Sequence, residues 1–186
     1  MNYFILRQDE RISHAVEPIG LSRVIKQEWL MTKEGIHELD QLDRQFSIKE
    51  KNTNEAIDLI EKPIRLISDR LKKLIEKYVP SLPMKSVVLV DKKNGSQLLY
   101  WLLITRTLAC LSAQTEFHPD GTIKKLVIEE EAAASYPIFK IEGVRENVLI
   151  VNVALAEGIL RRSFYGIRLQ KVATNGKWNE LQKRGY

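Results

Sequence analysis

Short apolar segments separated by turn residues run through this sequence, and their length limits what the chain can fold into. The longest uninterrupted apolar run, residues 98–104, has seven members, whereas a helix that spans a membrane needs about 20 apolar residues in a row. Short runs rich in β-branched and aromatic residues are typical of β-strands. We therefore expect a fold with many short strands and no membrane-spanning helix, and we predict no membrane partner.

Two turn signals between such runs predict β-hairpins. Asn94-Gly95 lies between residues 87–90 and residues 98–104, and an Asn-Gly pair readily adopts the positive φ angles of a tight hairpin turn. Pro119-Asp120-Gly121 stands in the same position between residues 112–118 and residues 123–128. Further strands are expected at residues 3–6, 136–141, 148–151 and 167–172.

Two segments carry the pattern of amphipathic helices. Over residues 68–79, Ser68 is a suitable N-cap, and apolar side chains share one face at Leu71, Leu74, Ile75, Tyr78 and Val79. Over residues 153–164, Asn152 is the predicted cap, and the expected inner face consists of Val153, Ala156, Ile159, Leu160 and Phe164. The apolar spacing between residues 29 and 46 is only partly helical, because Gly35 interrupts it.

Strands and helices are interspersed without a repeating strand–helix–strand unit. This order favours an α+β fold with a mainly antiparallel sheet, two principal helices (about residues 68–79 and 153–164) and a partly helical N-terminal region. A length of 186 residues fits a single domain, residues 1–186. Within it we distinguish an N-terminal subregion, residues 1–60, and a basic C-terminal tail, residues 173–186.

Cysteine and histidine are too few to staple the fold or to form a zinc site. The chain has one cysteine, Cys110, so it has no internal disulfide, and its three histidines lack ligand spacing. The N-terminus has no basic start followed by a long apolar stretch, so we expect no secretory signal. These features together predict a reducing, cytoplasmic location.

Motifs of catalysis and cofactor binding are missing from the sequence. The nine glycines form no phosphate-binding loop, and no serine lies in a Gly-x-Ser-x-Gly turn. Cys110 has apolar neighbours, which would raise the pKa of its thiol and leave it inert. We therefore predict no enzymatic activity, no catalytic residues, no cofactor and no metal site. An enzyme whose site is assembled from distant loop residues stays open as an alternative.

Positive charge is concentrated near the C-terminus. The whole chain carries a net charge of +5, and the segment from Arg161 to the end holds seven basic residues and one acidic residue. Such a segment can bind nucleic acid, an anionic membrane or an acidic protein face, or it can simply be a solvated end. The candidate anion-binding residues are Arg161, Arg162, Arg168 and Lys171.

The opposite charge gathers in the N-terminal subregion. Five acidic residues and one lysine lie between Glu28 and Asp43. A patch of this kind beside an aromatic residue combines steering charge with an anchor for a protein partner. The candidate protein-binding residues are Trp29, Glu34, Glu38, Asp40 and Asp43. A plain solvated helix face and a catalytic carboxylate pair are the competing interpretations.

Three segments of the sequence resemble a known family. They are residues 65–75, the strand at residues 138–141, and the helix-to-strand ending from residue 150 to residue 169. Over roughly residues 60–172 the chain is similar to an immunity-protein family of bacterial polymorphic toxin systems, long catalogued as a domain of unknown function. The resemblance implies a small cytoplasmic α+β protein that binds a cognate toxin and blocks it, without catalysis or cofactor.

Two function hypotheses follow from these observations. The first is a non-enzymatic immunity protein that occludes the active site of a toxin. The alternative is a nucleic-acid-binding accessory protein that uses the basic C-terminal segment. Immunity proteins against basic nuclease toxins tend to be acidic, whereas this chain is positively charged. Either the toxin is not a basic nuclease, or the acidic residues between Glu28 and Asp43 make the contact. The sequence leaves the oligomeric state open.

Overall fold

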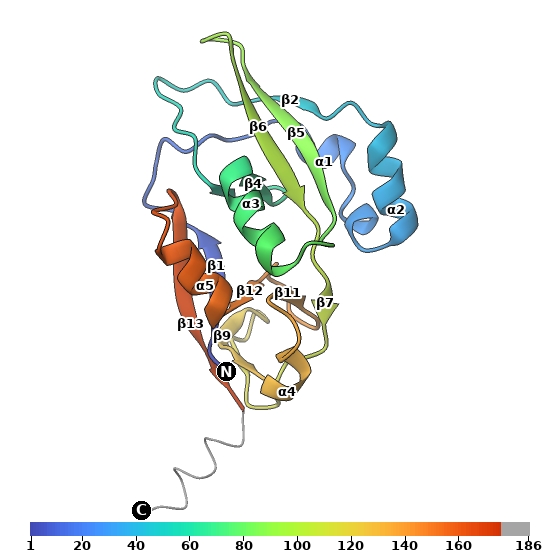
Figure 1. Cartoon of the computed structure of the whole chain (residues 1–186), viewed down its shortest axis with the longest axis vertical. Helices are drawn as coiled ribbons and strands as arrows, with labels where there is room; N and C mark the ends of the chain where they lie inside the picture. The colour runs from blue at the N-terminus through green and yellow to red at the C-terminus, as the bar shows by residue number, and fades with distance from the viewer. Residues whose placement is uncertain (176–186) are drawn as a thin grey trace, which may run out of the picture. The chain divides into compact units, whose positions relative to one another are not determined.

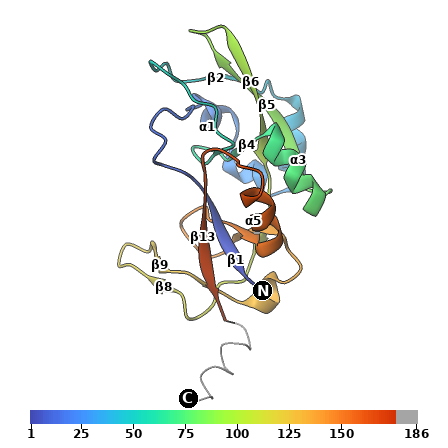
Figure 2. The ribbon, with the colours of Figure 1, turned by 60° about the vertical axis from the view of Figure 1, so that its left-hand side comes forward.

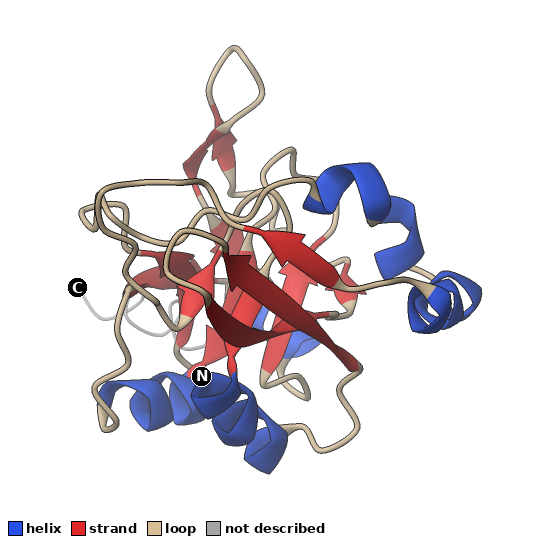
Figure 3. Ribbon diagram, turned by 90° about the horizontal axis from the view of Figure 1, so that it is seen from above, coloured by secondary structure: helices blue, strands red, loops and turns tan. Residues whose placement is uncertain are grey.

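The computed structural model describes residues 1–175. Strands and helices are interspersed along the chain. Both kinds of element are visible in Figure 3, which confirms the expected α+β class. The chain divides into two compact units. One comprises Met1–Leu6, Thr105–Gly158 and the described residues from Leu169 on, and the other comprises Arg7–Ile104 and Ile159–Arg168. Of the predicted tail, Ala173 and Thr174 belong to a strand, and residues 176–186 lie outside the described residues.

The first unit is built on a six-stranded sheet with the order β10-β13-β1-β12-β11-β7. Its strands are β1 (Tyr3–Gln8), β7 (Thr107–Leu108), β10 (Val127–Ile128), β11 (Ile138–Ile141), β12 (Leu149–Asn152) and β13 (Ile167–Thr174). A separate hairpin, β8 (Glu116–Phe117) and β9 (Ile123–Lys125), is visible in Figure 2 and confirms the turn predicted at Pro119-Asp120-Gly121. A short helix, α4 (Glu130–Ala133), follows β10.

The core of the first unit contains the predicted buried cysteine. Tyr3 and Phe139 are fully buried and meet edge to face, with their ring centroids 6.0 Å apart, an arrangement that adds to the burial of two large rings. Cys110 is a free, buried thiol in the same cluster, and burial raises its pKa. The cysteine therefore packs as a small apolar side chain.

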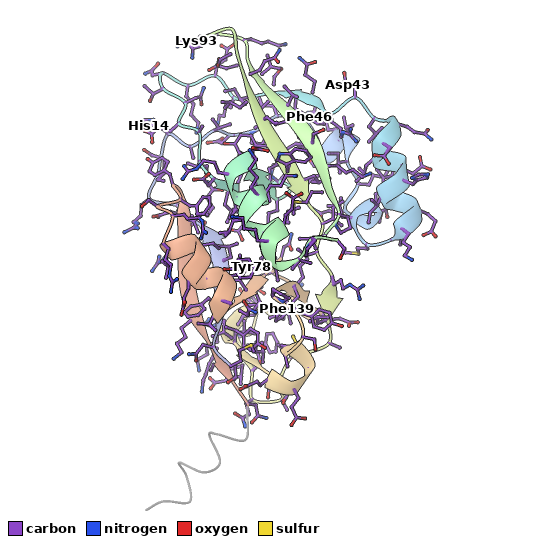
Figure 4. The ribbon with its side chains drawn as sticks, viewed as in Figure 1. His14, Asp43, Phe46, Tyr78, Lys93 and Phe139 are labelled. Carbon is purple, nitrogen blue, oxygen red and sulfur yellow. The ribbon has the colours of Figure 1, made fainter. Side chains whose placement is uncertain are left out.

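The second unit is built on a five-stranded sheet with the order β2-β5-β6-β4-β3. Its strands are β2 (Gln45–Ser47), β3 (Leu59–Ile60), β4 (Leu66–Ser68), β5 (Met84–Asp91) and β6 (Ser96–Leu103). The long hairpin β5–β6 turns at Gly95, whose φ is 64°, so the hairpin predicted around Asn94-Gly95 is confirmed (Figure 1). The side chain of Phe46 on β2 packs into the core of this unit (Figure 4).

Strand pairing in both sheets is mixed, which qualifies the expectation of a mainly antiparallel sheet. Strand β12 pairs antiparallel with β1 and β11, and β6 pairs antiparallel with β4 and β5. A short strand adds in parallel at an edge in three places: β10 beside β13, β7 beside β11 and β2 beside β5. A parallel pair needs a long crossover connection. β2 and β5 are separated by residues 48–83, which allow the chain to return in the same direction.

Helix α3 (Asp69–Tyr78) is the element that the sequence predicts best. The hydroxyl of Ser68 accepts a hydrogen bond from the backbone N–H of Leu71 at 3.2 Å, as expected for an N-cap. The helix lies against the hairpin (Figure 1), and the indole N–H of Trp101 on β6 donates to Asp69 at 3.2 Å. The ammonium of Lys72 lies 4.3 Å from the centre of the same ring.

Four short helices form the N-terminal part of the second unit, as the partly helical pattern predicts. They are α1 (Leu21–Val24), η1 (Gln27–Leu30), α2 (Lys33–Glu38) and η2 (Leu39–Gln41). The hydroxyl of Thr32 caps α2 by accepting a hydrogen bond from the N–H of Gly35 at 3.0 Å. The buried residues Leu21, Leu30 and Leu39 fix these helices to the core.

The second principal helix is shorter than predicted. Asn152 caps α5 (Val153–Leu160) through the N–H of Leu155, but the expected helix over residues 153–164 ends at Leu160. Ser163 has a φ of 47°, a left-handed conformation that cannot continue an α-helix. Leu160, the last residue of the helix, is 69% exposed instead of lying on the predicted inner face, and Phe164 is half-buried in the turn that follows.

Candidate functional site

The predicted acidic residues lie on the N-terminal helices of the second unit. Trp29 is in η1, Glu34 and Glu38 are in α2, Asp40 is in η2, and Asp43 lies in the connection to β2 (Figure 4). All four carboxylates are on exposed residues, whereas Trp29 is half-buried. The structure therefore brings the five predicted residues into one region, but their environments differ.

Asp40 lies close to three basic side chains of its own unit. The ammonium of Lys85 on β5 lies 2.6 Å from its carboxylate, and Arg44 and His37 each lie 3.6 Å away. The hydrogen bond from Lys85 lowers the pKa of Asp40, as do the charges of Lys85 and Arg44. Asp43 is also used locally, because it accepts the backbone N–H of Gln45 at 3.1 Å. The acidic charge open to a partner is thus smaller than the sequence indicates.

Trp29 contributes to the packing between two helices. A Cβ added to Gly35 would lie 2.4 Å from the Cα of Trp29 and 2.7 Å from its carbonyl oxygen, so α2 approaches η1 as only a glycine permits. The ammonium of Lys26 lies 5.2 Å from the centre of the indole ring, close enough for a cation–π contact. The indole also packs against the core, so only part of the ring is available to a partner.

Glu34 and Glu38 remain as the open part of the acidic region, which we name the acidic helix face. Both are exposed, and they lie one turn apart on α2. Within residues 1–175 neither side chain forms an ion pair with a neighbour. This face carries charge that can steer association.

The four predicted anion-binding residues do not gather in one unit. Arg161, Arg162 and Arg168 belong to the second unit, whereas Lys171 lies on the part of β13 that belongs to the first. All four are exposed. Within the second unit, Arg161 and Arg162 occupy the turn that follows α5, and this turn can be followed in Figure 2 where orange changes to red.

A buried carboxylate holds this turn in place. Asp58 is only 6% exposed, and its carboxylate accepts hydrogen bonds from the hydroxyl of Ser68 and, at 2.7 Å, from the backbone N–H of Tyr165. The backbone N–H of Asp58 donates in return to the carbonyl of Tyr165 at 2.7 Å. The hydroxyl of Tyr165 donates to Glu55 at 2.5 Å, which raises the pKa of the tyrosine.

Two backbone positions give the turn its shape. Ser163 and Gly166 both have positive φ angles, 47° and 77°. A Cβ on Gly166 would lie 2.6 Å from the Cβ of Ile57, so the backbone passes directly over this side chain. The carbonyl of Gly166 also accepts the backbone N–H of Asp9 at 3.0 Å. A positive φ at a serine is sparsely populated and persists only where the surrounding contacts enforce it.

The side chains that this turn presents form a second candidate surface, which we name the arginine face. The guanidinium of Arg70 on α3 lies 5.1 Å from the centre of the Phe164 ring and donates to the carbonyl of Arg162 at 3.2 Å. The arginine face consists of Arg70, Leu160, Arg161, Arg162 and Phe164. The sequence identifies Arg161 and Arg162, but it gives no sign that Arg70 joins them or that Leu160 faces outward.

In the described part of the chain, no three His, Cys, Asp or Glu side chains are grouped so that they could hold a metal ion. None of the helices within residues 1–175 has both the length and the apolar character needed to cross a bilayer.

Comparison with known proteins identifies the family. A search of curated proteins found no significant match. Among protein families, residues 14–174 match the Immunity protein family (Imm11). The match extends the resemblance seen over residues 60–172 toward the N-terminus, so it includes the acidic helix face as well as the arginine face. Because the matched region covers most of the 186 residues, this chain belongs to the Immunity protein family (Imm11).

Proposed function

We propose that this protein neutralises a cognate bacterial toxin by binding it in the cytoplasm and covering its active site, without any reaction of its own. The observation that carries the proposal is membership of the immunity protein family over residues 14–174. The partner is then a toxin of a polymorphic toxin system. A protein that acts in this way needs a rigid surface that complements the toxin in shape and charge.

Two surfaces of the second unit are candidates for this contact, and their charges require different partners. The acidic helix face, with Glu34 and Glu38, would meet a basic region of the toxin, as the sequence-based hypothesis holds for Trp29, Glu34, Glu38, Asp40 and Asp43. The arginine face would meet an acidic region. Charge reversal on one face and then on the other therefore distinguishes them.

Protection of cells tests the proposed function. We expect bacteria that express the toxin domain encoded beside this gene to survive when the present chain is co-expressed, and to die without it. A variant with the core substitution Leu89→Asp serves as the control, because Leu89 is fully buried and an unpaired carboxylate there prevents folding. Equal killing with and without the wild-type chain would contradict the proposal.

A further inference from the structure

We infer that the arginine face is the anchor of the toxin contact, and that the toxin presents an acidic protein surface with an apolar recess that receives Leu160. This inference rests on the proposed function and specifies the surface and the chemistry of the partner.

The arginine face is held in its shape before any partner binds. Asp58 fixes Tyr165 through two hydrogen bonds of 2.7 Å, and Gly166 is fixed over Ile57. Arg70 is likewise positioned, because it stacks on Phe164 and donates to the carbonyl of Arg162. A surface that is ordered in the free protein loses less conformational entropy on binding, so more of its contact energy appears as affinity.

The arginine face contains residue types that are enriched at protein–protein interfaces, namely arginine and phenylalanine. Arginine and aromatic residues are enriched at the centre of protein–protein contacts, where they carry most of the binding energy. Leu160 is 69% exposed at the end of α5, which places an apolar side chain in water beside Arg161 and Arg162. Burial of this leucine in a recess of the partner would remove that apolar surface from water.

The charge of this region indicates an acidic partner. The arginine face itself carries three guanidinium groups, those of Arg70, Arg161 and Arg162, and no carboxylate. Of the carboxylates against the turn, Asp58 is buried and Glu55 accepts a hydrogen bond from the hydroxyl of Tyr165. A guanidinium can bind a carboxylate through two parallel hydrogen bonds, which gives orientation as well as attraction. The side chains that this face prefers are therefore aspartate and glutamate.

A protein fits this face better than a nucleic acid does. Single-strand binders use open aromatic faces on which bases stack, whereas the ring of Phe164 is half-buried and is contacted by the guanidinium of Arg70. An exposed leucine offers nothing to a phosphate backbone but fits an apolar recess in a protein. The alternative of a nucleic-acid partner is kept as an outcome of the test below.

The acidic helix face lacks an equivalent anchor. Trp29 is half-buried and packs against the core, and Met31, which lies just before α2, is 73% exposed. Methionine has three rotatable side-chain bonds and loses much rotamer freedom when a partner holds it. Charge without a fixed anchor steers association more than it sustains a complex.

The test measures binding of the full chain to the toxin domain encoded by the neighbouring gene, by calorimetry. We expect the double charge reversal Arg161→Glu with Arg162→Glu to raise the dissociation constant by about 100-fold. Leu160→Ala is expected to raise it by about 10-fold. The matched control reverses two charges on the acidic helix face, Glu34→Lys with Glu38→Lys, and is expected to change affinity by less than about threefold. All five positions are exposed, so circular dichroism should show folded variants.

Four results would overturn the inference. If the Glu34/Glu38 variant loses binding while the Arg161/Arg162 variant keeps it, the acidic helix face is the contact. If both variants bind as the wild type does, the contact lies elsewhere. If the wild type binds a single-stranded oligonucleotide with a steep salt dependence that the Arg161/Arg162 variant lacks, the face serves nucleic acid. Failure of the wild type itself to bind the toxin domain would remove the proposed function, and this inference with it.

Discussion

Replacement of Gly166 with alanine is expected to lower the free energy of unfolding by about 3 kcal/mol. Gly166 has a φ of 77°, and an added Cβ would lie 2.6 Å from the Cβ of Ile57 and 2.8 Å from its Cγ2. The left-handed conformation costs about 1–2 kcal/mol for a residue with a Cβ. Overpacking against a buried side chain adds a cost of similar size. Urea denaturation followed by tryptophan fluorescence measures the difference.

Gly20 provides a matched control for this substitution. Its φ of 82° is close to that of Gly166, but nothing lies within 4 Å of the position that a Cβ would take. Gly20→Ala therefore carries the cost of the positive φ alone, about 1–2 kcal/mol. Equal losses for the two variants would show that the contact with Ile57 is not tight. Because Gly166 shapes the turn, we also expect Gly166→Ala to weaken toxin binding.

Replacement of Gly35 with alanine is expected to lower the free energy of unfolding by about 2 kcal/mol, against the direction that helix propensity predicts. Alanine in place of a helical glycine gains about 1 kcal/mol. Here, however, the new Cβ would lie 2.4 Å from the Cα of Trp29 and 2.7 Å from its carbonyl oxygen. Backbone atoms cannot move aside as the end of a side chain can, so the clash outweighs the propensity.

The same denaturation experiment decides the sign of this effect. Lys33→Ala, an exposed change in the same helix, is the control and should alter stability by less than about 0.5 kcal/mol. A more stable Gly35→Ala variant would show that α2 does not pack closely on η1. If the arginine face is the anchor, the folded fraction of Gly35→Ala should bind the toxin domain as the wild type does.

Elements with local signals were predictable from the sequence. Helix α3 was predicted because Ser68 and the apolar stripe Leu71, Leu74 and Ile75 lie within one segment. The hairpin β5–β6 was predicted because Asn94-Gly95 fixes its turn. Pairings between distant segments carry no such signal. The parallel pairing of β2 with β5 depends on the path that residues 48–83 take between the two strands, and the sequence pattern does not predict this path.

The end of α5 shows why a regular pattern can mislead. Apolar spacing continues to Phe164, but the helix ends at Leu160 because the chain turns to bring Tyr165 to Asp58. Those two residues are 107 positions apart. A contact between such distant residues overrides local periodicity. For the same reason, the sequence could not predict that Arg70 and residues 160–164 form one surface.

The sequence locates the acidic region, but it overstates the negative charge that this region leaves open to a partner. The sequence locates Asp40 in a run of carboxylates, yet its closest cation, Lys85, is 45 residues away on β5. Sequence spacing also leaves Trp29 as an apparent anchor, whereas in the structure its side chain packs against the core of its own unit. Net charge over a segment therefore overstates what a partner meets when distant residues neutralise it.

Titration of the wild-type chain into the toxin domain encoded beside its gene tests the central claim most directly, with the activity of the toxin recorded in the same samples. A protein that works by occlusion should form a one-to-one complex, and toxin activity should fall in proportion to the complex formed until it is lost at equivalence. Absence of a complex at micromolar concentrations, or a complex in which the toxin keeps its full activity, would contradict the account.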